Sequence, residues 1–333
     1  MITVENLTKS FTGRGGPVLA LDDVNLAVPE ATICGVLGGS GAGKTTLARC
    51  IALQERPDRG AIRVGGTDLL SLGRAADVQR RVGVVPFEAG LARQRTVAGN
   101  VALPLERAGI GGPQRRAKVV ELLDLVGLAD RAGAGLAQLG PGQRRRVALA
   151  RALATGPSVL VADAPTDGAD PAAATGVLTA LDRIRSELDV SVILLTSDIA
   201  AVRRICDDIA VLEGGRLVEQ GRLLQLVTRN GSRTAAAVLP AVPAAPVDGG
   251  YDRFAEVVLV GFATVGALLP EASARFGVEI AVLGGGLTRL GDTPVARFGV
   301  GVSGERADSA LAWIAEHGAS VYRAQSGPQG VAA

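Results

Sequence analysis

Short apolar runs alternate with amphipathic stretches through the first two-thirds of the chain. Residues 158–163 and 191–197 each contain an uninterrupted apolar run, which is typical of parallel strands that are covered on both faces. Residues 32–38 are also strand-like, and helical periodicity follows them over Thr45–Leu53. A second helical pattern covers Gln114–Val126. This alternation of strands and helices predicts an α/β fold.

The pattern changes at about residue 228. Just before it, residues 211–221 predict a hairpin that turns at a Gly-Gly pair, near the end of the first domain. The stretch 229–250 is rich in alanine and proline and has neither a helical nor a strand period, so we expect an interdomain linker. The predicted division is a domain at 1–228, a linker at 229–250 and a second domain at 251–333.

The second domain shows a β-α-β-β-α-β order of strand-like and helix-like segments. A strand and a helix are expected within 253–277, and a pair of strands within 278–303. The stretch Glu305–Glu316 then has apolar residues at helical spacing, before a closing strand. This order predicts a smaller α+β domain of the ferredoxin-like kind.

Composition narrows the possible functions without pointing to a substrate. The 333 residues are 47% hydrophobic with a net charge of +2, which favours a folded protein and gives no reason to expect nucleic-acid binding. The three cysteines are scattered, as in a reducing compartment. The longest apolar run, 257–269, is shorter than the roughly 20 residues that span a bilayer, and the first residues do not resemble a secretory signal. We expect a cytosolic chain unless a partner holds it at a membrane.

A glycine-rich segment lies between a predicted strand and a predicted helix. In this context "GGSGAGKTT" is typical of a P-loop, whose backbone N–H groups turn inward on phosphates at a helix N-terminus. Lys44 can reach the β- and γ-phosphates, while the Thr45 hydroxyl and Asp163, at the end of a buried strand, can hold Mg²⁺. The sequence therefore predicts a site for ATP and Mg²⁺. Its loop residues are Gly38, Gly39, Ser40, Gly41, Ala42, Gly43, Lys44, Thr45 and Thr46.

Further motifs carry a family resemblance. "LGPGQRRRVALARAL", "VLVADAPTDGADP" and "RTVAGNVALPLE", together with the P-loop, resemble the ATP-binding subunits of ABC transporters, and more narrowly those of bacterial methionine importers. The C-terminal unit resembles the substrate-sensing, NIL-type domain of the same family. The resemblance covers nearly the whole chain, apart from the linker.

This resemblance implies partners and additional site residues. A pair of such subunits would sandwich two ATP molecules and drive two membrane-spanning permease subunits from the cytoplasmic face of the membrane. The second subunit of the pair is either an identical chain or a catalytically intact homologue. Phe11 would stack on adenine; the alternative is that it is a core residue of an edge strand. The residues that would reach the γ-phosphate of the other subunit are Leu139, Gly140, Pro141, Gly142 and Gln143.

Four departures from the family pattern fall on positions that handle the reaction. Ala164 stands where the family has the glutamate that polarises the attacking water, and a positioned base contributes about 10²–10⁴-fold. Ser197 stands where the family has a histidine, and Phe87 where it has a glutamine. Gly140 and Pro141 lack the hydroxyl and the backbone N–H of the family's signature. We therefore expect nucleotide binding to be preserved and hydrolysis to be impaired.

Other interpretations stay open at this point. Hydrolysis could run through Glu88, Asp167 or Asp198, or the chain could be a non-transport regulator that binds ATP as a structural ligand. By resemblance, the C-terminal domain would bind methionine or a similar amino acid and pair with its twin. Gly284–Gly286 either offer backbone donors to a carboxylate or form a bulged edge strand.

Overall fold

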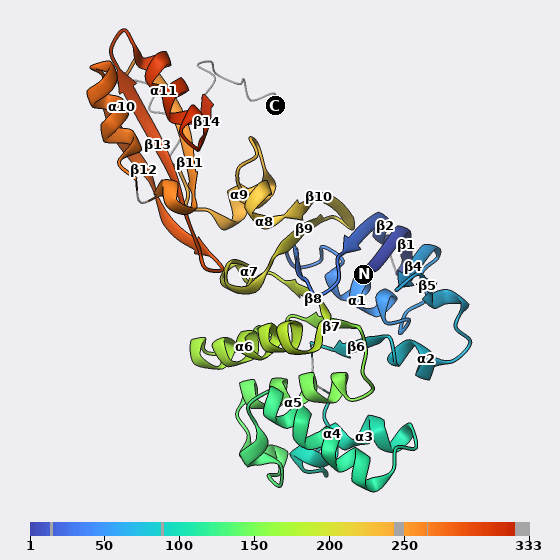
Figure 1. Cartoon of the computed structure of the whole chain (residues 1–333). Helices are drawn as coiled ribbons and strands as arrows, with labels where there is room; N and C mark the ends of the chain where they lie inside the picture. The colour runs from blue at the N-terminus through green and yellow to red at the C-terminus, as the bar shows by residue number, and fades with distance from the viewer. Residues whose placement is uncertain (14–15, 88–89, 243–249, 265, 324–333) are drawn as a thin grey trace. The chain divides into compact units, whose positions relative to one another are not determined.

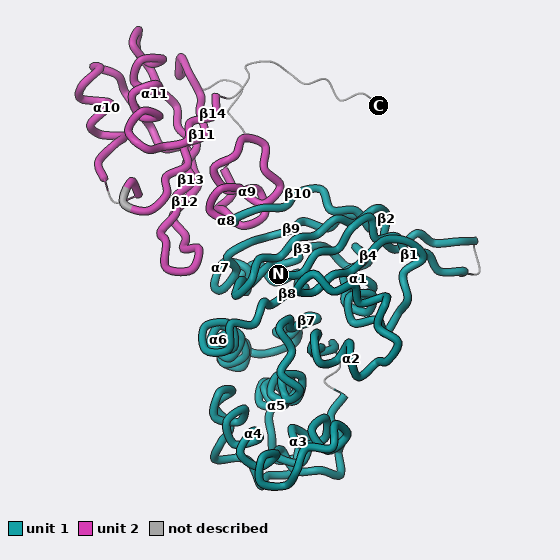
Figure 2. The backbone as a smooth tube through the Cα atoms, turned by 45° about the vertical axis from the view of Figure 1, so that its right-hand side comes forward, with its two compact units in different colours: residues 1–222 teal, residues 223–333 magenta. Residues whose placement is uncertain are grey.

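The computed structural model describes residues 1–13, 16–87, 90–242, 250–264 and 266–323. The chain forms two compact units, Met1–Arg222 and Leu223–Ala333 (Figure 2). The boundary between them follows Arg222, whereas the sequence pattern placed the end of the first domain at residue 228. Each unit has its own core and is described by itself.

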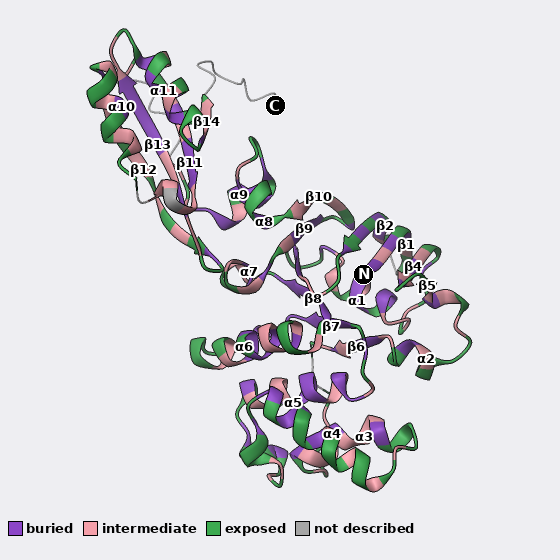
Figure 3. Cartoon of the chain, viewed as in Figure 1, coloured by how far each residue is buried: buried purple, intermediate pink, exposed green. Residues whose placement is uncertain are grey.

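The first unit is built on a six-stranded sheet in the order β10-β9-β3-β8-β7-β6 (Figure 1). Neighbouring strands from β9 to β6 are parallel, and β10 pairs antiparallel with β9 as the predicted hairpin. Every residue of β3, β7 and β8 is buried (Figure 3), so the apolar runs form the central strands as predicted. The strands are β3 (Ile33–Leu37), β6 (Val82–Val85), β7 (Val159–Asp163), β8 (Ser191–Thr196), β9 (Asp208–Glu213) and β10 (Arg216–Arg222).

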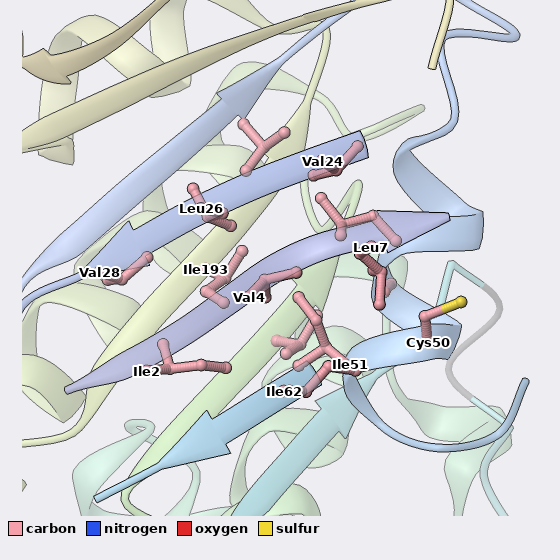
Figure 4. Close-up of a cluster of buried hydrophobic side chains, with 14 of the residues drawn as sticks. Ile2, Val4, Leu7, Val24, Leu26, Val28, Cys50, Ile51, Ile62 and Ile193 are labelled. Atoms are coloured by element: carbon pink, nitrogen blue, oxygen red, sulfur yellow. The ribbon is translucent and has the colours of Figure 1, made fainter. Parts of the chain in front are cut away.

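A smaller antiparallel sheet of the same unit has the order β2-β1-β4-β5. Ile2, Val4 and Leu7 on β1 belong to one buried cluster with Leu26 on β2 and Ile193 on β8 (Figure 4). The two sheets therefore share a core, and this core fixes the position of the first helix between them. The strands are β1 (Ile2–Gly13), β2 (Gly16–Val28), β4 (Arg59–Val64) and β5 (Thr67–Asp68).

Helices complete the first unit. Helix α1 contacts β7 and β8, and α6 contacts β8 and α7. Helices α3, α4 and α5 pack on one another as a separate group, and α5 also contacts α6 (Figure 1). The helical patterns predicted from Thr45 and from Gln114 correspond to α1 and α4. The helices are α1 (Lys44–Ile51), α2 (Ala75–Gln79), α3 (Val97–Arg107), α4 (Gly112–Leu125), α5 (Pro141–Leu153), α6 (Pro171–Leu188) and α7 (Ile199–Ile205), with single 3-10 turns η1 (Leu69–Ser71), η2 (Ala129–Arg131) and η3 (Leu136–Gln138).

The second unit contains the predicted β-α-β-β-α-β arrangement. Its antiparallel sheet has the order β12-β13-β11-β14, the strand order of a ferredoxin-like fold. The helices α10 and α11 share one buried cluster with inward-facing residues of β11 and β13. The elements are β11 (Arg253–Val260), the 3-10 turn η4 (Gly261–Thr264), α10 (Leu268–Phe276), β12 (Glu279–Leu290), β13 (Thr293–Ser303), α11 (Ala307–Glu316) and β14 (Ala319–Arg323).

The range predicted to be a linker without periodic structure contains a helix. Helices α8 (Leu223–Leu226) and α9 (Arg233–Val238) belong to the second unit, and the Ser232 side chain caps α9 by accepting a 3.0 Å hydrogen bond from the backbone N–H of Ala235. A run of alanines is a good helix former once a capping serine starts it. The expectation of an aperiodic segment throughout 229–250 was therefore wrong; residues 243–249 of this range lie outside the described residues.

The segment around α9 packs on the sheet of its own unit. A side chain added at Gly299 would lie 2.4 Å from Val242, and one added at Gly301 would lie 2.6 Å from the Tyr251 ring. The Tyr322 hydroxyl on β14 also donates a hydrogen bond to the carbonyl of Thr228. Glycines on β13 thus leave room for Val242 and Tyr251, which come before β11 in sequence. The sequence pattern did not predict this packing, because it depends on the absence of side chains at Gly299 and Gly301.

We predict that Gly301→Ala destabilises the second unit by about 1–3 kcal/mol, because the new methyl group would overlap the Tyr251 ring. The fluorescence of Trp313, the only tryptophan of the chain, reports on this unit during denaturant unfolding. In a Tyr251→Ala background the cost should largely disappear, as expected for a direct contact. Gly250→Ala, where the added methyl group meets open space, is the matched control. An equal cost in both backgrounds would contradict the packing described above.

Candidate nucleotide-binding site

The loop between β3 and α1 has a backbone shape that only glycine fits easily. Gly43, with φ 104°, precedes the first residue of α1, and Gly41 has φ 78°. An added Cβ would lie 2.6 Å from the Leu212 carbonyl oxygen at Gly38, and 2.6 Å from the Ala20 carbonyl oxygen at Gly43. The loop is therefore held close to neighbouring backbone, at the positive N-terminal end of a helix. This geometry suits a bound phosphate group.

Lys44 supplies a positive charge at this loop. Its Nζ atom donates hydrogen bonds to the carbonyl oxygens of Gly38 and Gly39, at 2.7 and 2.8 Å. The ammonium group is thus held by the loop that it would serve. Because Lys44 is the first residue of α1, its position follows directly from the strand–loop–helix connection.

Asp163 is the last residue of β7 and only 4% exposed. Burial raises the pKa of its carboxyl group, and a hydrogen bond with the Thr45 hydroxyl and the charge of Lys44 oppose this rise. A carboxylate and a hydroxyl are hard oxygen ligands of the type that Mg²⁺ accepts beside substrate phosphates. Thr45 and Asp163 therefore lie together as the sequence predicted, and the loop, Lys44 and these oxygens fit ATP with Mg²⁺.

Ala164 follows Asp163 in a left-handed backbone conformation, with φ 47°. Its N–H donates to the Leu195 carbonyl at 2.8 Å, and its own carbonyl accepts a 2.8 Å hydrogen bond from the guanidinium of Arg145. The side chain is a methyl group that is 6% exposed. The backbone of Ala164 is thus well held by hydrogen bonds, but its side chain offers no group that could take a proton.

Two of the alternative bases have defined positions. Asp198 caps α7: its carboxylate accepts hydrogen bonds from the N–H groups of Ala200 and Ala201, and from the Thr166 hydroxyl at 3.0 Å. A carboxylate engaged in this way is poorly placed to activate water. Asp167 lies in the turn after β7, and its N–H donates to the Ala164 carbonyl at 3.2 Å. Glu88 lies outside the described residues, and Ser197 is exposed between β8 and α7.

Phe87 lies just after β6 and is 51% exposed. The guanidinium carbon of Arg145 lies 5.7 Å from the centre of its ring, a cation–π contact. Both residues line a cavity of about 790 Å³, together with Pro141 and Arg144. Arg145 was not among the expected site residues. Its position two residues after Gln143, on a helix beside the site, was the signal that could have indicated it.

The expected signature segment forms the start of α5. Gly140 is the N-cap residue and Pro141 the first helical residue, where a missing N–H costs no helical hydrogen bond. The Gln143 side chain accepts a 3.0 Å hydrogen bond from the Gly140 N–H, so it caps its own helix. An added Cβ at Gly142 would lie 2.7 Å from the Ala173 Cβ on α6. Leu139 is buried, and the reach of this segment toward another subunit stays a prediction.

Phe11 lies on β1 and is 38% exposed, so it is not a fully buried core residue. The Lys9 ammonium lies 5.1 Å from the centre of its ring, and Lys9 is held by Glu55 at 2.8 Å and Asp58 at 3.5 Å. The ring therefore has an open surface beside a positive charge. Stacking on adenine stays a prediction.

These features define a P-loop nucleotide-binding protein with an added ferredoxin-like domain. The family model for the ABC transporter matches residues 21–167, and the model for the NIL domain matches residues 253–322. The two matches fall in the two compact units of the structure.

Similar proteins agree with both matches. The methionine import ATP-binding protein MetN of Thermobifida fusca is 42% identical over 320 residues, covering 95% of this chain and 97% of the relative. The corresponding protein of Myxococcus xanthus is 40% identical and covers 98% of this chain and 100% of the relative. The chain belongs to the ABC-transporter family of ATP-binding proteins, in the group that carries a NIL domain.

A solved structure resembles the first unit. The ATP-binding cassette MJ0796, in a dimeric post-hydrolysis state bound to ADP and Pi, has a TM-score of 0.61 and 28% identity, covering 67% of this chain and 98% of that chain. The α/β P-loop fold predicted from the sequence is therefore confirmed. Within the described part of the chain, no helix has the length and apolar character needed to cross a membrane.

We predict that Lys44→Ala abolishes measurable binding of ATP with Mg²⁺ in calorimetry. Removing one partner of a close charge pair costs about 2–5 kcal/mol. Lys118→Ala is the matched control, because Lys118 pairs with Glu121 on the surface of α4. The control should bind ATP as the unaltered protein does. Equal affinity of the Lys44 variant and the unaltered protein would contradict the assignment of the loop.

Proposed function

We propose that this chain is the ATP-binding subunit of an importer for methionine or a related amino acid, with impaired ATP hydrolysis. The observation that carries the proposal is a contrast between the residues that would bind nucleotide and the residue that follows Asp163. The cradle, Lys44, Thr45 and Asp163 are in place, whereas Ala164 offers only a methyl group. The similarity to methionine import ATP-binding proteins supports the transport role and its substrate.

The residues of this chain account for binding more completely than for turnover. When bound, ATP supplies a reactive phosphoanhydride and Mg²⁺ neutralises part of its negative charge. The loop N–H groups and Lys44 would hold the phosphates, and Thr45 and Asp163 would hold the metal. Positions 164, 197 and 87 carry a methyl group, an exposed hydroxyl and an aromatic ring, none of which is a general base near neutral pH. Binding therefore does not depend on the groups that hydrolysis lacks.

The proposal includes membrane and subunit partners. As a transporter subunit, the chain would lie at the cytoplasmic face of the membrane against permease subunits. The dimeric state of the similar cassette supports pairing of two ATP-binding domains. The second domain in the pair is either an identical chain or an intact homologue, which would supply the complete signature that Gly140 and Pro141 do not provide.

The second unit would pair with its twin and respond to an amino acid. Its edge strand β12 carries Val282 and Leu287, which are 54% and 63% exposed, and unpaired edge strands suit pairing between chains. Gly285 has φ 104°, and an added Cβ would lie 2.0 Å from the Arg297 carbonyl oxygen, next to a break in register at Val282–Gly284. A β-bulge thus explains the presence of these glycines in the strand. Pairing is therefore better supported than ligand sensing.

We predict that the unaltered protein releases phosphate from ATP at least about 100-fold more slowly than a variant with a restored site. That variant combines Ala164→Glu, Ser197→His, Phe87→Gln, Gly140→Ser and Pro141→Gly, together with Arg145→Gln, because the Arg145 guanidinium lies 2.8 Å from the Ala164 carbonyl oxygen and would engage the new carboxylate. Ala164→Glu alone should give little, because groups that act as a unit are strongly non-additive. Steady-state phosphate release measures this, with Lys44→Ala added to each protein as the control. Robust hydrolysis by the unaltered protein that depends on Lys44 would refute impaired turnover.

We also predict that Leu287→Lys weakens self-association of the nucleotide-free chain by at least about tenfold, because a charge would replace an apolar contact on the edge of the sheet. Mass measured by light scattering over a concentration series gives the result. Val218→Lys, at a 46% exposed position on β10, is the matched control in the first unit.

A calorimetric titration of the same samples with methionine, and with alanine for comparison, tests whether the second unit binds an amino acid. A chain that is monomeric throughout and shows no heat with methionine contradicts both roles of the second unit.

A further inference from the structure

One charged side chain joins two of the altered positions. Arg145, on α5, donates a 2.8 Å hydrogen bond to the carbonyl of Ala164 and a 3.5 Å hydrogen bond to the carbonyl of Asp167. Its guanidinium carbon also lies 5.7 Å from the centre of the Phe87 ring. The same group therefore contacts the turn after β7 and the segment after β6. These are the two places where the resemblance led us to expect a glutamate and a glutamine.

This guanidinium brings positive charge to the end of β7. Burial lowers the pKa of Arg145, while the nearby carboxylates of Asp167 and Asp163 raise it. An arginine remains protonated in such surroundings. The positive charge of Arg145 therefore acts on the proposed metal ligand Asp163, from a helix that is distinct from the P-loop helix.

The contact also restrains the backbone. Ala164 has φ 47°, a left-handed conformation that costs a residue with a side chain about 1–2 kcal/mol. Such a conformation persists when surrounding contacts hold it. Here the Leu195 carbonyl holds the N–H of Ala164, and Arg145 holds its carbonyl. Arg145 thus fixes the turn from which the side chain of residue 164 projects.

We propose that Arg145 is a positioning residue of the nucleotide site: it fixes the turn after β7, and it neutralises any carboxylate placed at position 164. The second part follows from distance, because a guanidinium nitrogen 2.8 Å from the carbonyl of a residue is within reach of a carboxylate on that residue's own side chain. A glutamate introduced there would form an ion pair with Arg145. The inference rests on the proposed function, in which position 164 faces the terminal phosphate of ATP.

The test is a charge cycle between positions 164 and 145. Ala164→Glu and Ala164→Gln are each made with Arg145 present and with Arg145→Gln. Calorimetry with Mg²⁺ measures the affinity of each protein for a non-hydrolysable ATP analogue and for ADP. With Arg145 present, the Glu and Gln variants should show similar ATP-analogue-to-ADP affinity ratios. With Arg145→Gln, the unpaired carboxylate should lower that ratio by about tenfold in the Glu variant only, because it repels the terminal phosphate.

Two further measurements separate the effect of the positive charge at position 145 from a general structural effect of its substitution. Combining Ala164→Glu with Arg145→Lys keeps a positive charge and should keep the ratio near that of Ala164→Glu alone. Without nucleotide, the Glu variant should unfold about 2–4 °C above the Gln variant while Arg145 is present, and this difference should vanish with Arg145→Gln. An affinity ratio and an unfolding temperature that do not depend on Arg145 would overturn the proposal.

The experiment distinguishes a failure of this inference from a failure of the proposed function. If the unaltered protein hydrolyses ATP well, impaired turnover is refuted, while the affinity cycle with the non-hydrolysable analogue still decides the role of Arg145. If none of the proteins binds nucleotide, ATP binding and the placement of position 164 beside a phosphate are refuted together. The ion pair is then decided by the unfolding temperatures alone.

Discussion

The burial of three parallel strands side by side is the constraint on which the rest of this chain depends. Strands β3, β8 and β7 are buried along their whole length, and parallel pairing brings their carboxyl ends to one edge of the sheet. At that edge the chain must leave the sheet, so the P-loop, Asp163 and the turn after β8 meet there. The site is therefore a consequence of sheet burial, and its chemistry depends on the residues that fill the edge.

The altered residues keep the roles that support the fold. Pro141 starts α5 without the loss of a helical hydrogen bond, and next to the altered Ser197 the side chain of Asp198 caps α7. Ala164 holds its turn through its backbone N–H and carbonyl, which any residue possesses. Because stability draws on backbone groups and caps, side-chain chemistry at these positions can change while the nucleotide cradle remains folded. Under the proposed function, this independence of the fold from side-chain chemistry is what would separate binding from turnover.

In the second unit, packing depends on positions where glycine provides no side chain. Its sheet carries glycines on the face away from α10 and α11, where Val242 and Tyr251 lie close to the strand backbone. The segment before the domain is therefore part of its fold, and an isolated fragment that begins at residue 251 would lack Val242 and α9. The edge strand β12 of this sheet carries the exposed side chains of Val282 and Leu287.

The sequence alone determined the elements whose signal lies within one window. Apolar runs gave the central strands, the strand–loop–helix context gave the cradle with Lys44 and Thr45, and segment order gave the ferredoxin-like unit. Only the tertiary structure decided that Val242 and Tyr251 pack on the sheet of their own unit, and that the Thr166 hydroxyl holds the Asp198 carboxylate. It also decided that Arg145 lies against Ala164 and Phe87. These contacts join residues far apart in sequence, so they depend on which faces meet, and no local period records them.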